Sequence, residues 1–260
     1  MIGDLIRLLL DSLTRLTLEL WKLYFRWCGT VATVRGYRIS GTDWKNLYIQ
    51  YKDEWIHQIY KFQTDSSTPR IIDGGANHGI SVMFFKSLYP NARILAFEPD
   101  PAVAELLQHN VTINKLSDVS IVRAALSDQP GELVFAPDGT SGGRADVEGS
   151  ITVPAVRLSD FITERVDFLK LNVEGAELTV FMDLDSTNKL KLVDQLVFEY
   201  HGWPNEPPKL GSILRIIERN HFHYLLHDFD RETCLASKPP FQLRDHPWFC
   251  LVYAKRMEPT

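Results

Sequence analysis

A glycine-rich turn at residues 70–79 carries the first side chains that could take part in ligand binding. Asp73, Gly75 and Gly79 form the pattern D-x-G-x-x-x-G, with Asn77 inside it. Glycine allows backbone torsion angles and close approaches that a Cβ atom forbids, so a ligand can lie against the turn. Asp73 can order the loop or accept a hydrogen bond from a ligand ammonium. The turn alone is equally typical of a tight strand-to-helix connection, and it lacks the G-x-G-x-x-G of dinucleotide sites.

An acidic residue, Glu98, follows the next apolar run, nineteen residues beyond Gly79. In sheets built from alternating strands and helices, a carboxylate at this position accepts hydrogen bonds from the hydroxyls of an adenosine ribose. The alternative is a helix N-cap, but Pro99 and Pro101 favour a rigid turn that holds Glu98 toward the ligand. We therefore expect Glu98 to bind a ribose.

A third apolar run ends in small and polar residues that suit a flat base. The side chain of Ala125 leaves room for a ring, and Ser127 with Asp128 can meet an exocyclic amine. Ser-Asp by itself is a common turn pair. Three suitable strand ends in chain order rarely arise by chance, so these turns together predict an adenosine site.

The elements that must position these residues alternate along the chain. The sequence predicts buried strands over 70–73, 93–97, 119–125, 168–172 and 195–200, helices over 80–88, 102–114, 177–184 and 210–219, and further strands over 222–227 and 249–254. This order predicts a parallel sheet with helices on both faces and antiparallel last strands. Ligands of such sheets bind beyond the carboxyl ends of the strands, which is where the candidate residues lie.

The stretch from Asp73 to His201 resembles the FkbM family of S-adenosylmethionine-dependent methyltransferases. The resemblance covers about half of the chain, and it rests on the segments 72–77 with Gly79, 97–101, 124–128, 156–160, 169–177 and 198–201, and on Asn110 with Asn114. Two positions depart from the family pattern: Asn172 stands where aspartate is usual, and His78 where an apolar residue is more typical.

The resemblance implies a class I methyltransferase fold: an α/β, Rossmann-like, mostly parallel seven-stranded sheet flanked by helices, here with an N-terminal helical extension. It implies S-adenosylmethionine as the cofactor and, most often, O-methylation of a sugar or natural-product hydroxyl. Donor binding is then expected at Asp73, Gly75, Asn77, Gly79, Glu98, Ala125, Ser127, Asp128 and Asn172. Two alternatives stay open: a donor-binding regulatory protein without turnover, and a nicotinamide-dependent oxidoreductase.

Methyl transfer to an alcohol needs in-line positioning and a group that accepts the hydroxyl proton. The candidates are Glu174 after the fourth strand, and Glu199 and His201 after the fifth. We favour His201 as the base because its ordinary pKa lies near neutral pH, with Glu174 second. Asn172, Glu174 and Glu199 could also present oxygens to a divalent cation. Hydrogen bonding within a substrate-orienting pocket explains the same residues, so we predict no metal site.

The N-terminal segment, residues 2–27, predicts an amphipathic helix and not a membrane span. Charged residues recur every three or four positions from Asp4 to Arg26, which places a polar stripe along a leucine-rich helix. The apolar arc must be covered by the main domain, by a second copy of the chain or by a membrane surface. We expect residues 1–63 to form this helix and a cover segment, and residues 64–260 to form the methyltransferase domain.

The composition narrows the class of partner. The 260 residues carry a net charge of -5, so the chain has no general positive field for nucleic acid. A small-molecule or glycan acceptor fits better. Cys28, Cys234 and Cys250 show no disulfide or zinc spacing, which favours a cytoplasmic protein, with peripheral membrane contact as the alternative.

Overall fold

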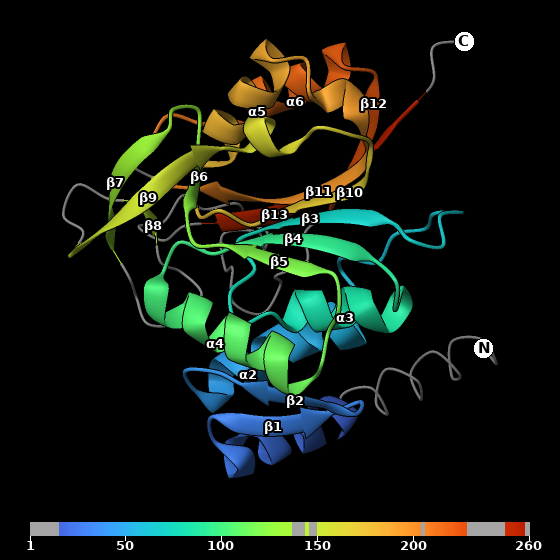
Figure 1. The fold of residues 1–260 in the computed structure, drawn as a ribbon, viewed down its shortest axis with the longest axis vertical. Helices are drawn as coiled ribbons and strands as arrows, with labels where there is room; N and C mark the ends of the chain where they lie inside the picture. The colour runs from blue at the N-terminus through green and yellow to red at the C-terminus, as the bar shows by residue number, and fades with distance from the viewer. Residues whose placement is uncertain (1–15, 137–143, 146–149, 204–205, 228–247, 258–260) are drawn as a thin grey trace, which may run out of the picture.

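A seven-stranded sheet forms the centre of the molecule, in the order β12-β13-β11-β10-β3-β4-β5 (Figure 1). The computed structural model describes residues 16–136, 144–145, 150–203, 206–227 and 248–257. The strands from β11 to β5 run parallel, and β13 is antiparallel to both of its neighbours. The sheet is built from β3 (Arg70–Gly74), β4 (Arg93–Phe97), β5 (Val119–Val122), β10 (Val166–Leu171), β11 (Val193–Gly202), β12 (Phe222–His227) and β13 (Trp248–Arg256). The predicted fold class is confirmed.

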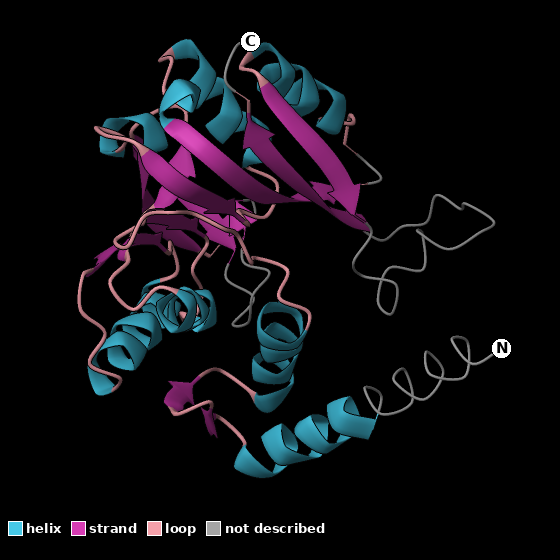
Figure 2. Cartoon of the chain, turned by 90° about the vertical axis from the view of Figure 1, so that its right-hand side faces the viewer, coloured by secondary structure: helices cyan, strands magenta, loops and turns pink. Residues whose placement is uncertain are grey.

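Helices cover both faces of this sheet (Figures 1 and 2). On one face lie α5 (Glu177–Ser186) and α6 (Leu210–Arg219), and on the other lie α3 (Ile80–Leu88) and α4 (Pro101–Ile113). The central strands are apolar on both sides because each side packs on a helical layer: Phe168 of β10 belongs to one buried cluster and Leu169 to the other. This packing fixes the carboxyl ends of the strands at one edge.

The predicted strand over 119–125 is divided in the structure. β5 ends at Val122, and β6 (Ala125–Ser127) pairs with β9 (Ile151–Arg157) in a separate four-stranded sheet of order β6-β9-β7-β8. A tight turn separates the two strands, since the amide of Ala124 donates to the carbonyl of Val122 at 3.0 Å. The small sheet, which also contains β7 (Gly131–Ala136) and β8 (Arg144–Ala145), thereby stands beside the edge of the main sheet.

The cover segment begins with a hairpin, β1 (Val31–Val34) and β2 (Tyr37–Ser40). It continues through α2 (Trp44–Tyr51), capped by Asp43, into a π turn, η1 (Lys52–Ile56). Asn110 of α4 holds the hairpin. Its side chain accepts from the amide of Ser40 at 2.8 Å and donates to the carbonyls of Ser40 at 2.7 Å and His78 at 2.8 Å.

The N-terminal helix is described over residues 16–28, and the rest of the predicted helix lies outside the described residues. Phe25 is fully buried against the cover segment. The opposite side is apolar and exposed: Leu16, Leu20, Leu23 and Trp27 are 58%, 59%, 60% and 85% exposed. Among the described helices, none combines the length and the hydropathy needed to cross a bilayer. Contact with a membrane surface or a second copy stays a prediction.

Candidate active site

The candidate residues meet where the strand order of the sheet reverses. From β3 the chain continues to β4 and β5 on one side, and it returns through β10 and β11 on the other. Ligands of open parallel sheets bind in the crevice at such a point. A pocket of about 570 Å³, counting its open mouth, lies at this edge between the turns after β3, β4 and β10 and the small sheet.

Five of the predicted site residues line this pocket together: Gly75, Glu98, Ala125, Asn172 and Glu174. They follow different strands and are brought into one cavity only by the parallel pairing of β3 with β4 and β10. The structure therefore assembles the side chains that the sequence placed after separate apolar runs.

The turn after β3 is pinned on two sides. The amides of Gly75 and Ala76 both donate to the carbonyl of Phe97, at 3.0 and 2.9 Å. Gly75 has φ +76°, and a Cβ atom there would lie 1.8 Å from the carbonyl oxygen of Asn172. Only glycine fits this position, because the turn backs directly onto the end of β10.

Glu98 lies at the pocket wall with both carboxyl oxygens engaged by the backbone. Oε2 accepts from the amide of Asn77 at 2.9 Å, and Oε1 accepts from the amide of Asp100 at 3.0 Å. Burial raises the pKa of Glu98 to about 7, although these two hydrogen bonds act in the opposite direction. A helix N-cap is the alternative role expected for Glu98. The N-cap of α4 is instead Asp100, whose side chain accepts hydrogen bonds from the amides of Ala102 and Val103. Glu98 is thus not used as a cap.

An apolar slot adjoins Glu98. Ala124, Ala125 and Leu126 form one part of its lining, and Leu133 and Phe135 of β7 form another. The sequence analysis missed Leu133 and Phe135. Alternation along β7, with buried Phe135, was the available signal.

The polar pair expected at the base lies beside this slot and does not line it. Ser127 is buried at the end of β6, and its hydroxyl lies 3.4 Å from Oδ1 of Asp128. Their expected contact with an exocyclic amine stays a prediction.

Two residues of the turn have roles in packing. The side-chain oxygen of Asn77 accepts from Nε2 of Gln50 at 3.0 Å, which ties the turn to the cover segment. Gly79 precedes α3, and a Cβ atom there would lie 2.5 Å from Cδ1 of Leu107. The φ of +84° at Gly79 and this close packing on α4 together favour glycine at this position.

Asp73 lies beneath the turn and has no exposed surface. Its Oδ2 accepts from the hydroxyl of Ser81 at 2.5 Å, and its Oδ1 forms an ion pair with Nζ of Lys170 at 2.9 Å. Nζ of Lys170 also donates to the carbonyls of Gly75 at 2.6 Å and Gly74 at 3.3 Å. Asp73 orders the loop through Lys170, which is the first of the two roles expected for it. The sequence analysis missed Lys170, although a lysine inside a buried apolar strand was a visible signal.

His201 lies at the end of β11 among three carboxylates. Its Nδ1 is 3.1 Å from Oε1 of Glu177, and its Nε2 is 3.1 Å from Glu174 and 3.7 Å from Glu199. Burial alone would lower the pKa of His201, but these charges raise it to about 10. At neutral pH the ring is an imidazolium with both N–H groups directed at carboxylates, so it has no lone pair for a proton. The base role expected for His201 therefore does not fit its surroundings.

Glu174 combines access to the pocket with a fixed position. Its side chain is 16% exposed, it lines the pocket, and its backbone has φ +50°. A positive φ at glutamate is uncommon and persists where the surrounding structure imposes it. Glu199 is similarly exposed, at 13%, but does not line this pocket. Within the described ranges, no group of three His, Cys, Asp or Glu side chains is placed to hold a metal ion.

Comparison with known proteins identifies the family. Residues 73–224, more than half of the chain, match the methyltransferase FkbM domain. Methyltransferase sdnD of Sordaria araneosa is 30% identical over 204 residues, which cover 63% of this chain and 78% of that protein. The 2-O-methyltransferase NoeI of Sinorhizobium fredii is 31% identical over 114 residues, which cover 43% of this chain and 46% of that protein.

The fold also matches a solved structure. The methyltransferase FkbM from Methylobacillus flagellatus superimposes with a TM-score of 0.50 at 15% identity, over 80% of this chain, and the chain spans half the length of that protein. The family match, over residues 73–224, covers the sheet edge described above. The chain belongs to the FkbM family of methyltransferases.

Proposed function

We propose that this protein transfers a methyl group from S-adenosylmethionine to a hydroxyl group of a small-molecule acceptor, such as a sugar or another natural product. The observation that carries the proposal is the single pocket in which Glu98, Gly75 and Glu174 meet. The O-methyltransferase name of the relative NoeI supports oxygen as the acceptor atom. The family match leaves the nicotinamide alternative without support.

The described residues fit the adenosine half of the donor. Glu98 is a carboxylate at the ribose position, beside an apolar slot between Ala125 and Phe135 that is open to a flat ring. Gly75 has no side chain, so its backbone is accessible from the pocket; a side chain at this position would collide with Asn172. When bound, the donor supplies an activated methyl group on a positively charged sulfur.

Glu174 is the residue that we assign to the acceptor proton. It presents a carboxylate to the pocket, and the imidazolium of His201 holds that carboxylate from behind at 3.1 Å. The positive ring limits the rotation of Glu174, so the carboxylate is positioned to receive the hydroxyl proton while oxygen attacks the methyl carbon. His201 is then a positioning residue, and Glu199 helps to hold the ring.

A donor-binding protein without turnover is the second candidate, because Asn172 supplies a neutral amide at the pocket where the family pattern has aspartate. The test has two arms. Calorimetry with S-adenosylhomocysteine measures donor-site binding, and incubation of cell extract with methyl-labelled donor and purified protein, followed by mass spectrometry, detects the product. Labelled product that is lost with Glu174→Gln supports O-methylation. Binding without product supports the second candidate, and absence of binding overturns both.

A further inference from the structure

The π turn of the cover segment buries a carboxyl group, one oxygen of which has no hydrogen-bond partner. Glu54 lies in η1 and is 8% exposed. Its Oε2 has no accessible surface and no hydrogen-bond partner among the described residues. A buried, unpaired carboxyl group is costly, and π turns occur frequently at functional sites. A π turn has one more residue than an α-helical turn. We infer that the extra residue in η1 serves to place Glu54.

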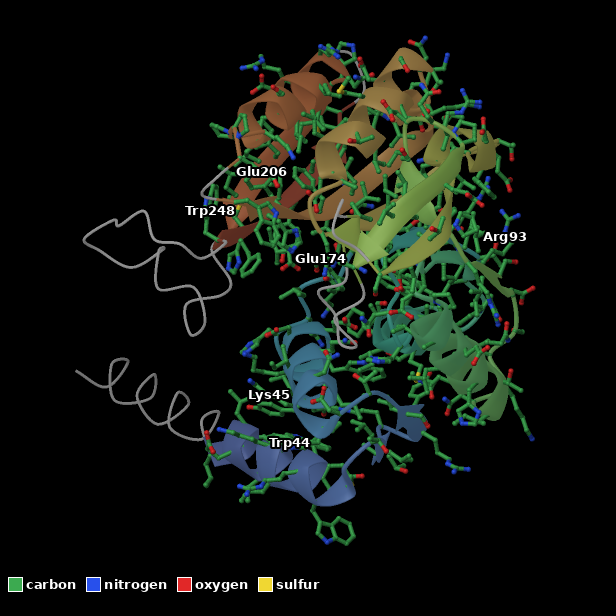
Figure 3. All side chains as sticks on the ribbon, turned by 90° about the vertical axis from the view of Figure 1, so that its left-hand side faces the viewer. Trp44, Lys45, Arg93, Glu174, Glu206 and Trp248 are labelled. Atoms are coloured by element: carbon green, nitrogen blue, oxygen red, sulfur yellow. The ribbon has the colours of Figure 1, made fainter. Side chains whose placement is uncertain are left out.

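Most of the charged groups that act on Glu54 lie at the edge of the sheet. The charged groups that act on it are Lys170, Asp73, Asp53 and Glu199, and burial raises its pKa well above the usual range. Figure 3 shows the end of the helix that starts beside Trp44 and Lys45 rising toward Glu174 at the edge of the sheet. The cover segment therefore presents this carboxyl group to the ends of β3, β10 and β11.

The cation nearest in charge to Glu54 is engaged with other groups. Nζ of Lys170 donates to the carbonyls of Gly74 and Gly75, and it forms an ion pair with Oδ1 of Asp73 at 2.9 Å. Lys170 lowers the charge penalty at Glu54 through space without bonding to it. A donor group from outside the described chain would pair this oxygen.

The course of the pocket indicates which chemical group would pair with Oε2 of Glu54. If the adenosine half lies against Glu98 and Ala125, the remainder of the donor must continue past Gly75 and Asn172 toward β10 and β11. That remainder ends in an α-ammonium group. We propose that Glu54 binds the α-ammonium of the donor's methionine part, so that the cover segment completes the donor site. This inference rests on the proposed function.

The test combines one protein change with one ligand change. S-adenosylhomocysteine carries the ammonium group, and 5′-methylthioadenosine lacks the whole amino-acid end. We expect Glu54→Gln to weaken binding of S-adenosylhomocysteine at least about tenfold, measured by calorimetry, and to change binding of 5′-methylthioadenosine less than twofold. Asp53→Asn removes a carboxylate one residue away and is the matched control, with a change below threefold for both ligands.

Two further results decide the inference. Equal losses for both ligands would make Glu54 a structural residue, and unchanged affinity for both would remove it from the site. A wild-type protein that binds neither ligand would instead contradict the proposed function. Because Oε2 of Glu54 has no hydrogen-bond partner, the ligand-free Glu54→Gln protein should melt no lower than wild type, while its stabilisation by S-adenosylhomocysteine should shrink. If Glu54→Gln does not fold, Glu54→Asp, which withdraws the carboxyl group by one methylene, replaces it in the same two-ligand comparison.

Discussion

Nδ1 of His201 lies 3.1 Å from Oε1 of Glu177, and both side chains are only 2% exposed. The same carboxylate oxygen accepts from the amide of Gly175 at 3.0 Å. Glu177 thus fixes the histidine ring and the loop after β10 at once. The loop carries Glu174, so the geometry of the pocket depends on a buried pair that does not itself line it.

The raised pKa of His201 predicts how stability changes with pH. The folded-state pKa is about 10, against an ordinary value of 6.5, so the charged ring stabilises the fold fully below pH 6.5. This contribution is lost as pH rises toward 10. The free energy of unfolding of wild type relative to His201→Gln, from denaturant titrations, should fall steadily over this range. A difference that does not change with pH would contradict the charged ring.

Glu174→Gln tests the base directly. The amide keeps the shape of the side chain but cannot accept the proton, so we expect turnover to fall by about 10² to 10⁴ while affinity for S-adenosylhomocysteine stays within about threefold. Glu199→Gln, which changes a carboxylate outside the pocket lining, is the control and should retain more activity. An equal loss of turnover in the two variants would contradict the assignment of the proton-accepting role to Glu174 alone.

Glu98 should make donor binding depend on pH. Ribose hydroxyls donate to the ionised carboxylate, whose pKa in the free protein is about 7. Affinity for S-adenosylhomocysteine should therefore fall below pH 7, by at most about tenfold per pH unit, and level off above it. Glu98→Ala should weaken binding at pH 8 by at least about tenfold and flatten the profile. An unchanged profile in the variant would assign the ribose to another group.

Gly75→Ala should abolish donor binding, because the new Cβ atom would lie 1.8 Å from the carbonyl oxygen of Asn172. The matched control is Gly29→Ala. Gly29 also has positive φ, +70°, but a Cβ atom there meets nothing within 4 Å. The control should lose about 1 to 2 kcal/mol of stability and bind normally. Calorimetry and thermal melting of both variants separate backbone strain from the collision.

Lys170 can be tested with a compensating change. Lys170→Met leaves Asp73 buried and unpaired, which should cost about 3–5 kcal/mol of unfolding free energy. Asp73→Asn combined with Lys170→Met removes both charges and should recover most of that loss in denaturant titrations. Donor affinity should stay weak in the double variant, since the carbonyl of Gly75 still lacks its donor. If the double variant recovers both its unfolding free energy and its donor affinity, the role of Lys170 is only to neutralise the charge of Asp73.

The residues at the strand ends could be predicted from the sequence because each lies close in the chain to the apolar run that forms its strand. Gly75 and Glu98 each follow an apolar run directly, and parallel pairing then brings them together. The surroundings of His201 could not be predicted in the same way. Glu174, Glu177 and Glu199 come from a loop, a helix and a strand, and only their packing shows that His201 is enclosed by charge.

Other parts depended on contacts across the fold. Lys170 interrupts an apolar strand, but nothing in the sequence says that its partner is Asp73, for which both loop ordering and ligand contact are expected. The division between β5 and β6 depends on pairing of β6 with β9, which comes about thirty residues later in the chain. Glu54 lies in a segment that the sequence marks only as a cover.

Asn110 has a consequence for how the nucleoside is exchanged. Its amide nitrogen donates both to Ser40 in the hairpin and to His78 in the glycine turn. Lifting the hairpin would break both hydrogen bonds to Ser40 and loosen the side chain that also steadies the turn. The hairpin should therefore stay closed from one catalytic cycle to the next.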